Sequence, residues 1–143
     1  MEKISNVCLL IFLFIVAFKD LKTKEVSIKL CGVFSGIGLL LIILKIMSGY
    51  EISLLSLLGG MALGAAFLLI SAFSRGALGM GDGLVMTICG LYMGFEINLE
   101  IIFLAFLASA IIGSILWIMK KKRKKETIAF LPFVMAGYVL SII

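Results

Sequence analysis

The 143-residue sequence contains no histidine, one proline, one tryptophan and three cysteines. Histidine is the usual metal ligand and general base near neutral pH, so acid–base chemistry would fall to carboxylates, lysines or tyrosines. Cys8, Cys31 and Cys89 stand in apolar runs without a C-x-x-C pair, which favours small packing residues over a zinc site or disulfide framework. We therefore expect neither a metal site nor a cofactor.

Charge is also scarce, at 15% of residues against 63% hydrophobic residues. The mean hydropathy is +1.27. A soluble domain needs more polar surface than this to cover its core, so we predict an integral membrane protein. No stretch is long enough to form a separate soluble module, and we expect one membrane-embedded domain over residues 1–143.

Six apolar segments predict an all-α fold, a bundle of six transmembrane helices at 4–18, 26–48, 52–74, 83–95, 99–119 and 127–143. The second, third and fifth reach the roughly 20 residues needed to cross a bilayer. The fourth covers only about 20 Å as a helix, so its start should lie near or just inside the membrane interface. The first has no small-x-small cleavage site after it, and we interpret it as a retained helix rather than a signal peptide.

Small residues recur four positions apart in three of these segments, a spacing that lets helix backbones approach closely in lipid. The pairs are Gly32 with Gly36, Gly60 with Gly64, and Ser109 with Gly113. This spacing is common in membrane proteins and predicts a compact bundle only.

Basic residues gather in the loops on one side of the predicted bundle. That side holds 11 of the 13 lysines and arginines, namely Lys19, Lys22, Lys24, Lys29, Arg75 and the run from Lys120 to Lys125. By the positive-inside rule these loops face the cytoplasm and both termini face outward. We expect the run from Lys120 to Lys125 to contact anionic lipid headgroups. It has no interleaved aromatic residues and no folded soluble module, so we expect no nucleic-acid binding.

Two aspartates stand at the ends of apolar segments, Asp20 after the first and Asp82 before the fourth. An ionised carboxylate near hydrocarbon is costly unless it is paired, hydrated or protonated, so both are functional candidates. The predicted topology places both at the cytoplasmic ends of their helices. Each alone has a simpler interpretation: Asp20, beside Lys19 and Lys22, as a solvated flank, and Asp82 as a helix N-cap.

Two carboxylates that share one proton can hydrolyse a peptide bond. The ionised group activates a water, and the protonated group polarises the carbonyl and later protonates the leaving amine. No metal and no histidine are required, which fits the composition. Glycines beside Asp82 leave room for an extended substrate backbone, so we expect Gly79, Met80, Gly81 and Gly83 to bind substrate.

The chain resembles the type IV prepilin peptidase family, the membrane aspartic peptidases of the G-x-G-D class. Three patches carry the resemblance: Asp20-Leu21 after the first segment, R-G-A-L-G-M-G-D at 75–82, and I-A-F-L-P-F at 128–133 after a basic loop. The resemblance implies that Asp20 and Asp82 are the catalytic pair of an aspartic endopeptidase. Its substrates would be prepilin-like precursors (pilins, pseudopilins or archaellins), cut after a short basic leader at the cytoplasmic face of a bacterial or archaeal cell membrane.

The chain also departs from the family pattern. Many bacterial members carry an N-terminal extension with a cysteine-rich loop and methylate the new N-terminus. This chain begins three residues before its first segment, so we expect the short form without methyltransferase activity. Val26-Ser27 stands where the family often has Ile-Pro, and Leu84 where it commonly has lysine. These departures bear on substrate preference and leave the peptidase chemistry intact.

Two other functions fit parts of the pattern. A small proton- or ion-coupled transporter could use Asp20 and Asp82 as relay groups, although no acidic residue lies in the middle of a predicted span. A presenilin-type intramembrane protease shares the G-x-G-D motif. This chain is short for that class, and Leu131-Pro132-Phe133 does not match its proline-alanine-leucine motif.

Overall fold

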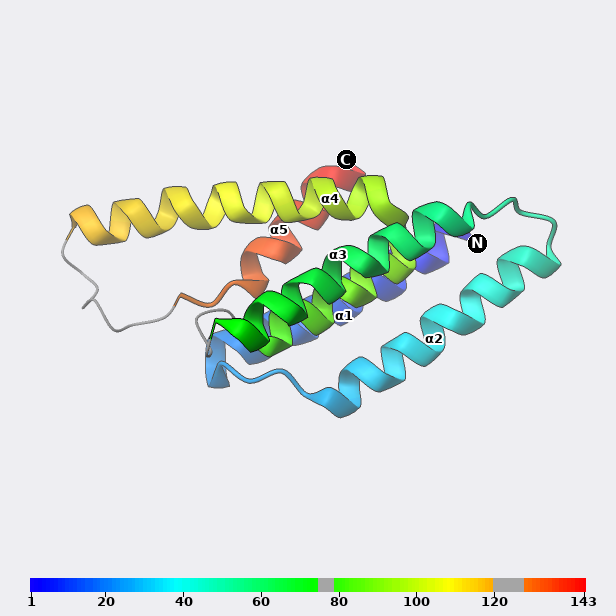
Figure 1. Ribbon diagram of the computed structural model, residues 1–143. Coiled ribbons are helices and arrows are strands. Elements are labelled where there is room, and N and C mark those ends of the chain that lie inside the picture. The colour runs from blue at the N-terminus through cyan, green and yellow to red at the C-terminus, as the bar shows by residue number, and fades with distance from the viewer. Residues whose placement is uncertain (75–78, 120–127) are drawn as a thin grey trace.

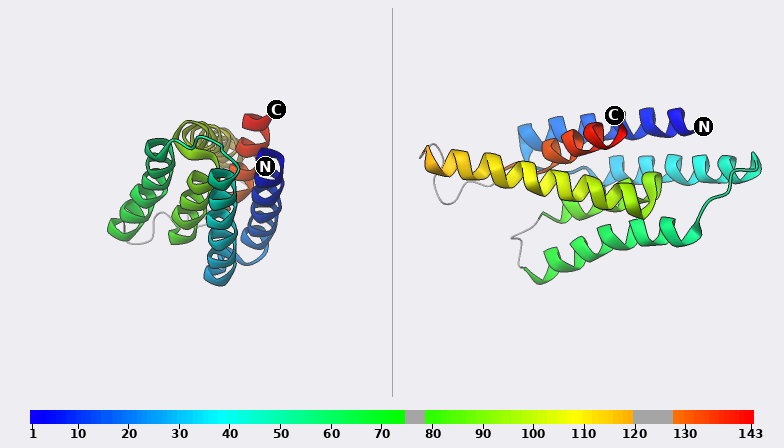
Figure 2. Two further views of the ribbon diagram at one scale, coloured as in Figure 1. Left: turned by 90° about the vertical axis from the view of Figure 1, so that its right-hand side faces the viewer. Right: turned by 90° about the horizontal axis from the view of Figure 1, so that it is seen from above.

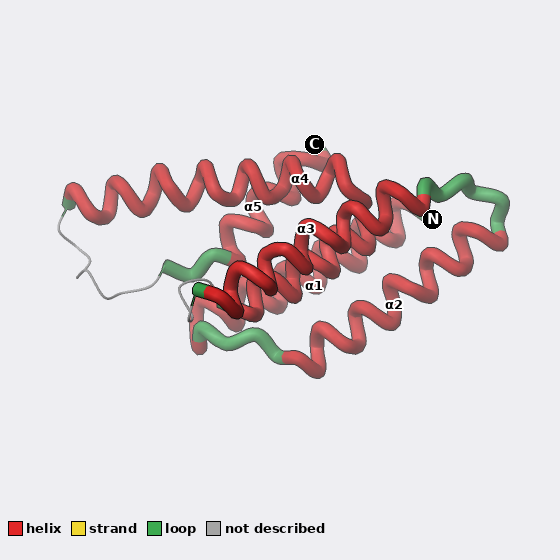
Figure 3. The backbone as a smooth tube through the Cα atoms, viewed as in Figure 1, coloured by secondary structure: helices red, strands yellow, loops and turns green. Residues whose placement is uncertain are grey.

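The structure, a computed structural model, describes residues 1–74, 79–119 and 128–143. Regular structure in these ranges is entirely helical: α1 (Glu2–Thr23), α2 (Ile28–Met47), α3 (Leu54–Phe73), α4 (Met80–Ile118) and α5 (Leu131–Ile142). The helices run side by side, and their connections gather at the two ends of the bundle (Figure 1, Figure 3). The predicted all-α class is confirmed.

The predicted count of six transmembrane helices is not supported. The described residues form five helices, of which α1, α2, α3 and α4 are long and apolar enough to cross a membrane. Helix α5 has 12 residues and is about 18 Å long, too short to span the hydrocarbon core. The predicted segments 83–95 and 99–119 both belong to α4. The four long apolar helices indicate a multi-pass membrane protein.

Helix α4 reverses direction at Gly94. This residue has φ of 78° and ψ of −169°, a backbone region that is essentially restricted to glycine. The chain runs one way as an N-terminal arm (80–93) and returns as a C-terminal arm (95–118), which all views show (Figure 1, Figure 2). The Oγ of Ser56 accepts the backbone N–H of Phe95 at 3.1 Å and so satisfies a donor that the reversal leaves without a helical partner.

Glycines on both helices allow α3 to approach the N-terminal arm of α4 closely. A Cβ on Gly60 would lie 2.7 Å from the carbonyl of Gly94, and one on Gly64 would overlap the backbone of Thr87. From the other side, a Cβ on Gly90 would overlap the carbonyl of Gly60. The close approach predicted from the spacing of Gly60 and Gly64 is confirmed, whereas Gly32 and Gly36 make none, since a Cβ at either meets nothing within 4 Å.

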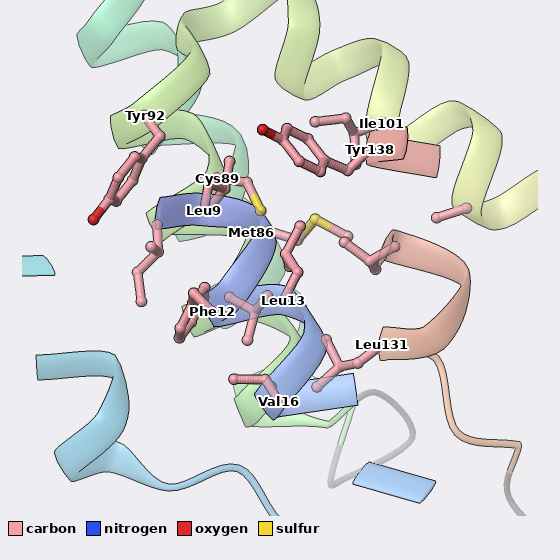
Figure 4. Packing of buried hydrophobic residues seen from close by; sticks show 14 of the residues in the cluster. Leu9, Phe12, Leu13, Val16, Met86, Cys89, Tyr92, Ile101, Leu131 and Tyr138 are labelled. Carbon is pink, nitrogen blue, oxygen red and sulfur yellow. The ribbon is translucent and has the colours of Figure 1, made fainter. Parts of the chain in front are cut away.

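The apolar core lies between α1, α4 and α5. Its fully buried side chains include Leu9, Phe12, Leu13, Val16, Met86, Cys89, Ile101, Leu131 and Tyr138 (Figure 4). The hydroxyl of Tyr138 donates to the carbonyl of Asn6 at 2.9 Å, and Asn98 donates to the carbonyls of Gly60 at 2.9 Å and Met86 at 3.2 Å. These bonds fix α5 against α1 and hold the two arms of α4 against α3.

The cysteines occupy packing positions, as predicted. Cys31 and Cys89 are buried and all three cysteines are free. The sulfur of Cys8 lies 3.6 Å from the hydroxyl of Tyr92, which donates to the carbonyl of Phe34 on α2 at 2.8 Å.

The glycine contacts make a specific stability prediction. Gly64→Ala should lower the free energy of unfolding by about 1–3 kcal/mol, because its Cβ has no space beside Thr87. Gly36→Ala is the matched control, since a Cβ there meets nothing within 4 Å, and it should be neutral or slightly stabilising. Thermal unfolding of both purified variants in detergent tests this; equal midpoints would contradict the α3–α4 packing.

Candidate functional site

Asp20 and Asp82 lie at the same end of the bundle. Asp20 is in the last turn of α1, and Asp82 is in the first turn of α4. Figure 1 shows these two helix ends beside the start of α5. Both aspartates line one cavity of about 500 Å³, and their side chains are close enough to interact electrostatically. The structure therefore brings together the two aspartates that the sequence analysis paired.

The carboxylate of Asp20 is bound by the start of α5. Asp20 is only 7% exposed, and its Oδ2 accepts the backbone N–H of Leu131 at 3.2 Å. The backbone of Phe130 also interacts with this carboxylate. The first N–H groups of a helix have no partner within the helix, and together they attract negative charge. Pro132 fits here because the first turn of a helix does not need its missing N–H.

Asp82 is more open than Asp20. It lies in the first turn of α4, where a negative charge is favourable to the helix dipole, and the backbone of Gly79 interacts with its carboxylate. A Cβ on Gly79 would stand 3.1 Å from Oδ2 of Asp82. Glycine at position 79 therefore leaves the carboxylate uncrowded on the side of the preceding loop.

The predicted substrate-binding residues divide into two groups. Gly79, Met80 and Gly81 line the cavity with Asp82, whereas Gly83 is not among its lining residues. Gly83 is buried in the α3 contact, where a Cβ would lie 2.8 Å from Cγ of Leu68. A Cβ on Gly81 would overlap the side chain of Val26. The space beside Gly81 is thus filled by Val26, so this glycine also serves packing between α4 and the turn after α1.

Three phenylalanines form one apolar wall of the cavity, and of these only Phe130, in the patch at 128–133, entered the sequence analysis. Phe67 of α3 stacks on Phe106 of α4, with ring centroids 5.6 Å apart, and Phe106 contacts Phe130 at 5.1 Å. All three line the cavity. The sequence contains 11 phenylalanines, and these three are far apart in it. No spacing pattern distinguishes them from phenylalanines that face lipid, so the wall could not be predicted from the sequence.

Lys24 is a further cavity residue, which contributed to the sequence analysis only through its charge, as one of the lysines that orient the bundle. It lines the cavity with both aspartates and interacts electrostatically with Asp20. Its position four residues after Asp20 was an available signal, because side chains at that spacing share one face of a helix. Residues 75–78 of the second sequence patch and the basic run from Lys120 to Lys125 lie outside the described residues.

Comparison with known protein families identifies a match. The model of the type IV leader peptidase family matches residues 7–118, a range that contains both Asp20 and Asp82. No curated protein and no solved structure matches the chain.

The contact between Gly81 and Val26 can be tested by a double-mutant cycle. Gly81→Ala alone should destabilise the protein by about 1–3 kcal/mol through overlap with Val26. In a Val26→Ala background the added methyl has space, so the same change should cost about 0.5–3 kcal/mol less. Thermal unfolding of the four proteins measures this coupling; additive effects would show that the two side-chain positions do not meet.

Proposed function

The chain belongs to the type IV leader peptidase family, and we propose that it is an aspartic endopeptidase that removes the short leader from prepilin-like precursors. The observation that carries this proposal is the placement of Asp20 and Asp82 on one cavity at one end of an apolar helix bundle. Two interacting carboxylates beside a space large enough for a peptide segment supply the groups that hydrolysis needs.

In the proposed reaction one carboxylate is ionised and the other holds a proton. The ionised group takes a proton from a water, whose oxygen attacks the carbonyl carbon of the scissile peptide. The protonated group gives its proton to the carbonyl oxygen, which stabilises the tetrahedral intermediate. When the intermediate collapses, the carbon–nitrogen bond breaks and the leaving amine takes a proton from the first carboxyl, not from the second as the sequence-based scheme had it, because the second has already given up its proton. The second carboxylate recovers a proton from one hydroxyl of the intermediate.

The shape and polarity of the cavity support a substrate with polar and apolar parts. Asp20, Asp82 and Lys24 provide its charged side, and Phe67, Phe106 and Phe130 its apolar side. A precursor cut between a basic leader and a hydrophobic helix presents both kinds of side chain at the scissile bond. The aromatic wall then holds the apolar side chain beside the carboxylates.

The cytoplasmic orientation rests on charge. The ends of α1 and α3 and the starts of α2 and α5 meet at the same end of the bundle as the two aspartates (Figure 1). In the sequence, most lysines and arginines stand in or beside the segments between α1 and α2, between α3 and α4, and between α4 and α5. The positive-inside rule assigns such segments to the cytoplasm of a bacterial or archaeal cell. The run from Lys120 to Lys125 would anchor this face to anionic headgroups.

The transporter alternative gains no support from the packing. Among the described residues, the buried polar and charged side chains are Ser5, Asp20, Ser71 and Asn98. Asp20, the acid among them, lies at a helix end. A relay across the membrane needs ionisable groups along its path, and this set does not supply them.

The proposal predicts that both aspartates are essential. When the chain is coexpressed with a prepilin-like precursor, Asp20→Asn and Asp82→Asn should each lower leader removal by about 10²–10⁴-fold, because each removes one acid–base group. Glu25→Gln is the matched control, since Glu25 is exposed and does not line the cavity. A gel shift of the precursor, at equal membrane levels of each variant, measures the rate. Wild-type processing by either asparagine variant would refute the dyad.

The aromatic wall predicts a difference between two phenylalanines of α4. Phe106→Ala should slow processing of a precursor with a large apolar residue beside the scissile bond by roughly tenfold, since Phe106, although 40% exposed, lines the cavity and the loss of an apolar contact is worth about this much in discrimination. Phe103→Ala should have little effect, because Phe103 is 65% exposed and outside the cavity. Equal effects of the two substitutions would argue against the wall as a substrate contact.

A further inference from the structure

Lys24 ends α1 in a backbone conformation that lysine rarely adopts. It has φ of 53° and ψ of 28°, and it is the one non-glycine residue with positive φ among those the structure describes. Glycine is the usual residue in this left-handed position after a helix, because a Cβ is disfavoured there. An unfavourable residue at the rim of a candidate site indicates that its side chain has a role there.

The turn at Lys24 fixes its position relative to Asp20. The backbone N–H of Lys24 donates to the carbonyl of Asp20 at 3.0 Å. Lys24 lines the cavity that contains Asp20 and Asp82, and its charge interacts electrostatically with the Asp20 carboxylate. One residue thus closes the helix and places a positive charge beside the buried carboxylate.

The surroundings of the two carboxylates differ in a way that sets their roles. Asp20 faces Lys24 from its own helix end, the backbone amides of Phe130 and Leu131 from α5, and Asp82 from α4. Asp82 faces the backbone of Gly79 and the negative charge of Asp20. Burial is the largest influence on both carboxyl groups and favours the protonated form of each. At Asp20 the amide donors and the nearby cation oppose this influence, whereas at Asp82 the neighbouring carboxylate adds to it.

We propose that Lys24 is a positioning residue that keeps Asp20 ionised, so that Asp20 takes the proton from the attacking water and Asp82 protonates the peptide carbonyl. The inference rests on the proposed peptidase function. The water oxygen bonds to the carbonyl carbon and the Asp82 proton moves to the carbonyl oxygen. On collapse the carbon–nitrogen bond breaks and the amine takes the proton from Asp20. Asp82 recovers a proton from one hydroxyl of the intermediate, which restores the starting pair.

The test is the pH dependence of precursor cleavage by the purified full chain in lipid nanodiscs. Lys24→Gln and Lys24→Gly should lose about three- to tenfold in kcat/KM on the acid side of the optimum, and little on the alkaline side. The acid limb of the profile therefore moves to higher pH. We expect a modest loss rather than abolition because an exposed lysine is partly screened by water.

Three variants, Lys24→Gly and two further ones, separate charge from structure. Lys24→Arg keeps the positive charge and should retain the wild-type profile. Lys24→Gly should melt no lower than wild type, because glycine adopts the left-handed turn readily, yet it should still lose activity at acid pH. Lys22→Gln, an exposed lysine of the same turn that does not line the cavity, should leave the profile unchanged.

The outcomes test the role of Lys24 and the peptidase function separately. A Lys24→Gly enzyme as active as wild type at every pH overturns the role of Lys24, as does an equal, pH-independent loss in the Gln and Arg variants. If the wild-type protein cleaves the precursor and both Asp20→Asn and Asp82→Asn abolish cleavage, the proposed peptidase function is supported even when the role of Lys24 is overturned. Absence of cleavage by the folded wild-type protein, or cleavage that survives both asparagine substitutions, overturns the proposed function and with it the role of Lys24.

Discussion

The buried carboxylate of Asp20 is the constraint around which this end of the molecule is arranged. A carboxylate that is 7% exposed in an apolar bundle needs donors or a counter-charge, because burial removes its water. The start of α5 supplies an N–H from Leu131 at 3.2 Å, and the turn after α1 supplies Lys24. Lys24 and Phe130, at the start of α5, also line the cavity that contains both aspartates, so the groups that stabilise the buried carboxylate form part of the site.

The reversal of α4 makes this arrangement possible. At Gly94 the chain turns back, and the C-terminal arm then lies against α5 and supplies Phe106 to the cavity. Helix α3 packs on the N-terminal arm of α4, and it can approach that arm closely only because Gly60 and Gly64 have no side chains. Small residues in the apolar interior thus determine where the polar residues at the end of the bundle meet.

The pairing of Asp20 and Asp82 could be predicted from the sequence, because loop charge and hydropathy decide which helix ends share a side of the membrane. The last turn of α1 could not, since hydropathy marks where lipid contact ends, whereas a helix can continue through charged residues. The prediction of six spans was wrong because Glu96 and Asn98 interrupt the apolar sequence inside α4, and because the apolar run 127–143 contains a helix of only 12 residues. The wall containing Phe106 and the contact of Gly81 with Val26 depend on packing between distant segments, which periodicity does not encode.

The central claim is that the carboxylates of Asp20 and Asp82 act together on one peptide bond. Its most direct test is the binding of a precursor peptide whose scissile amide is replaced by a hydroxyethylene group, a mimic of the tetrahedral intermediate. The account predicts that the wild-type protein binds this analogue at least about 10²-fold more tightly than it binds the parent peptide. It also predicts that the double variant Asp20→Asn/Asp82→Asn loses that advantage. An analogue bound no better than the parent peptide, or equally well by the double variant, would contradict the account.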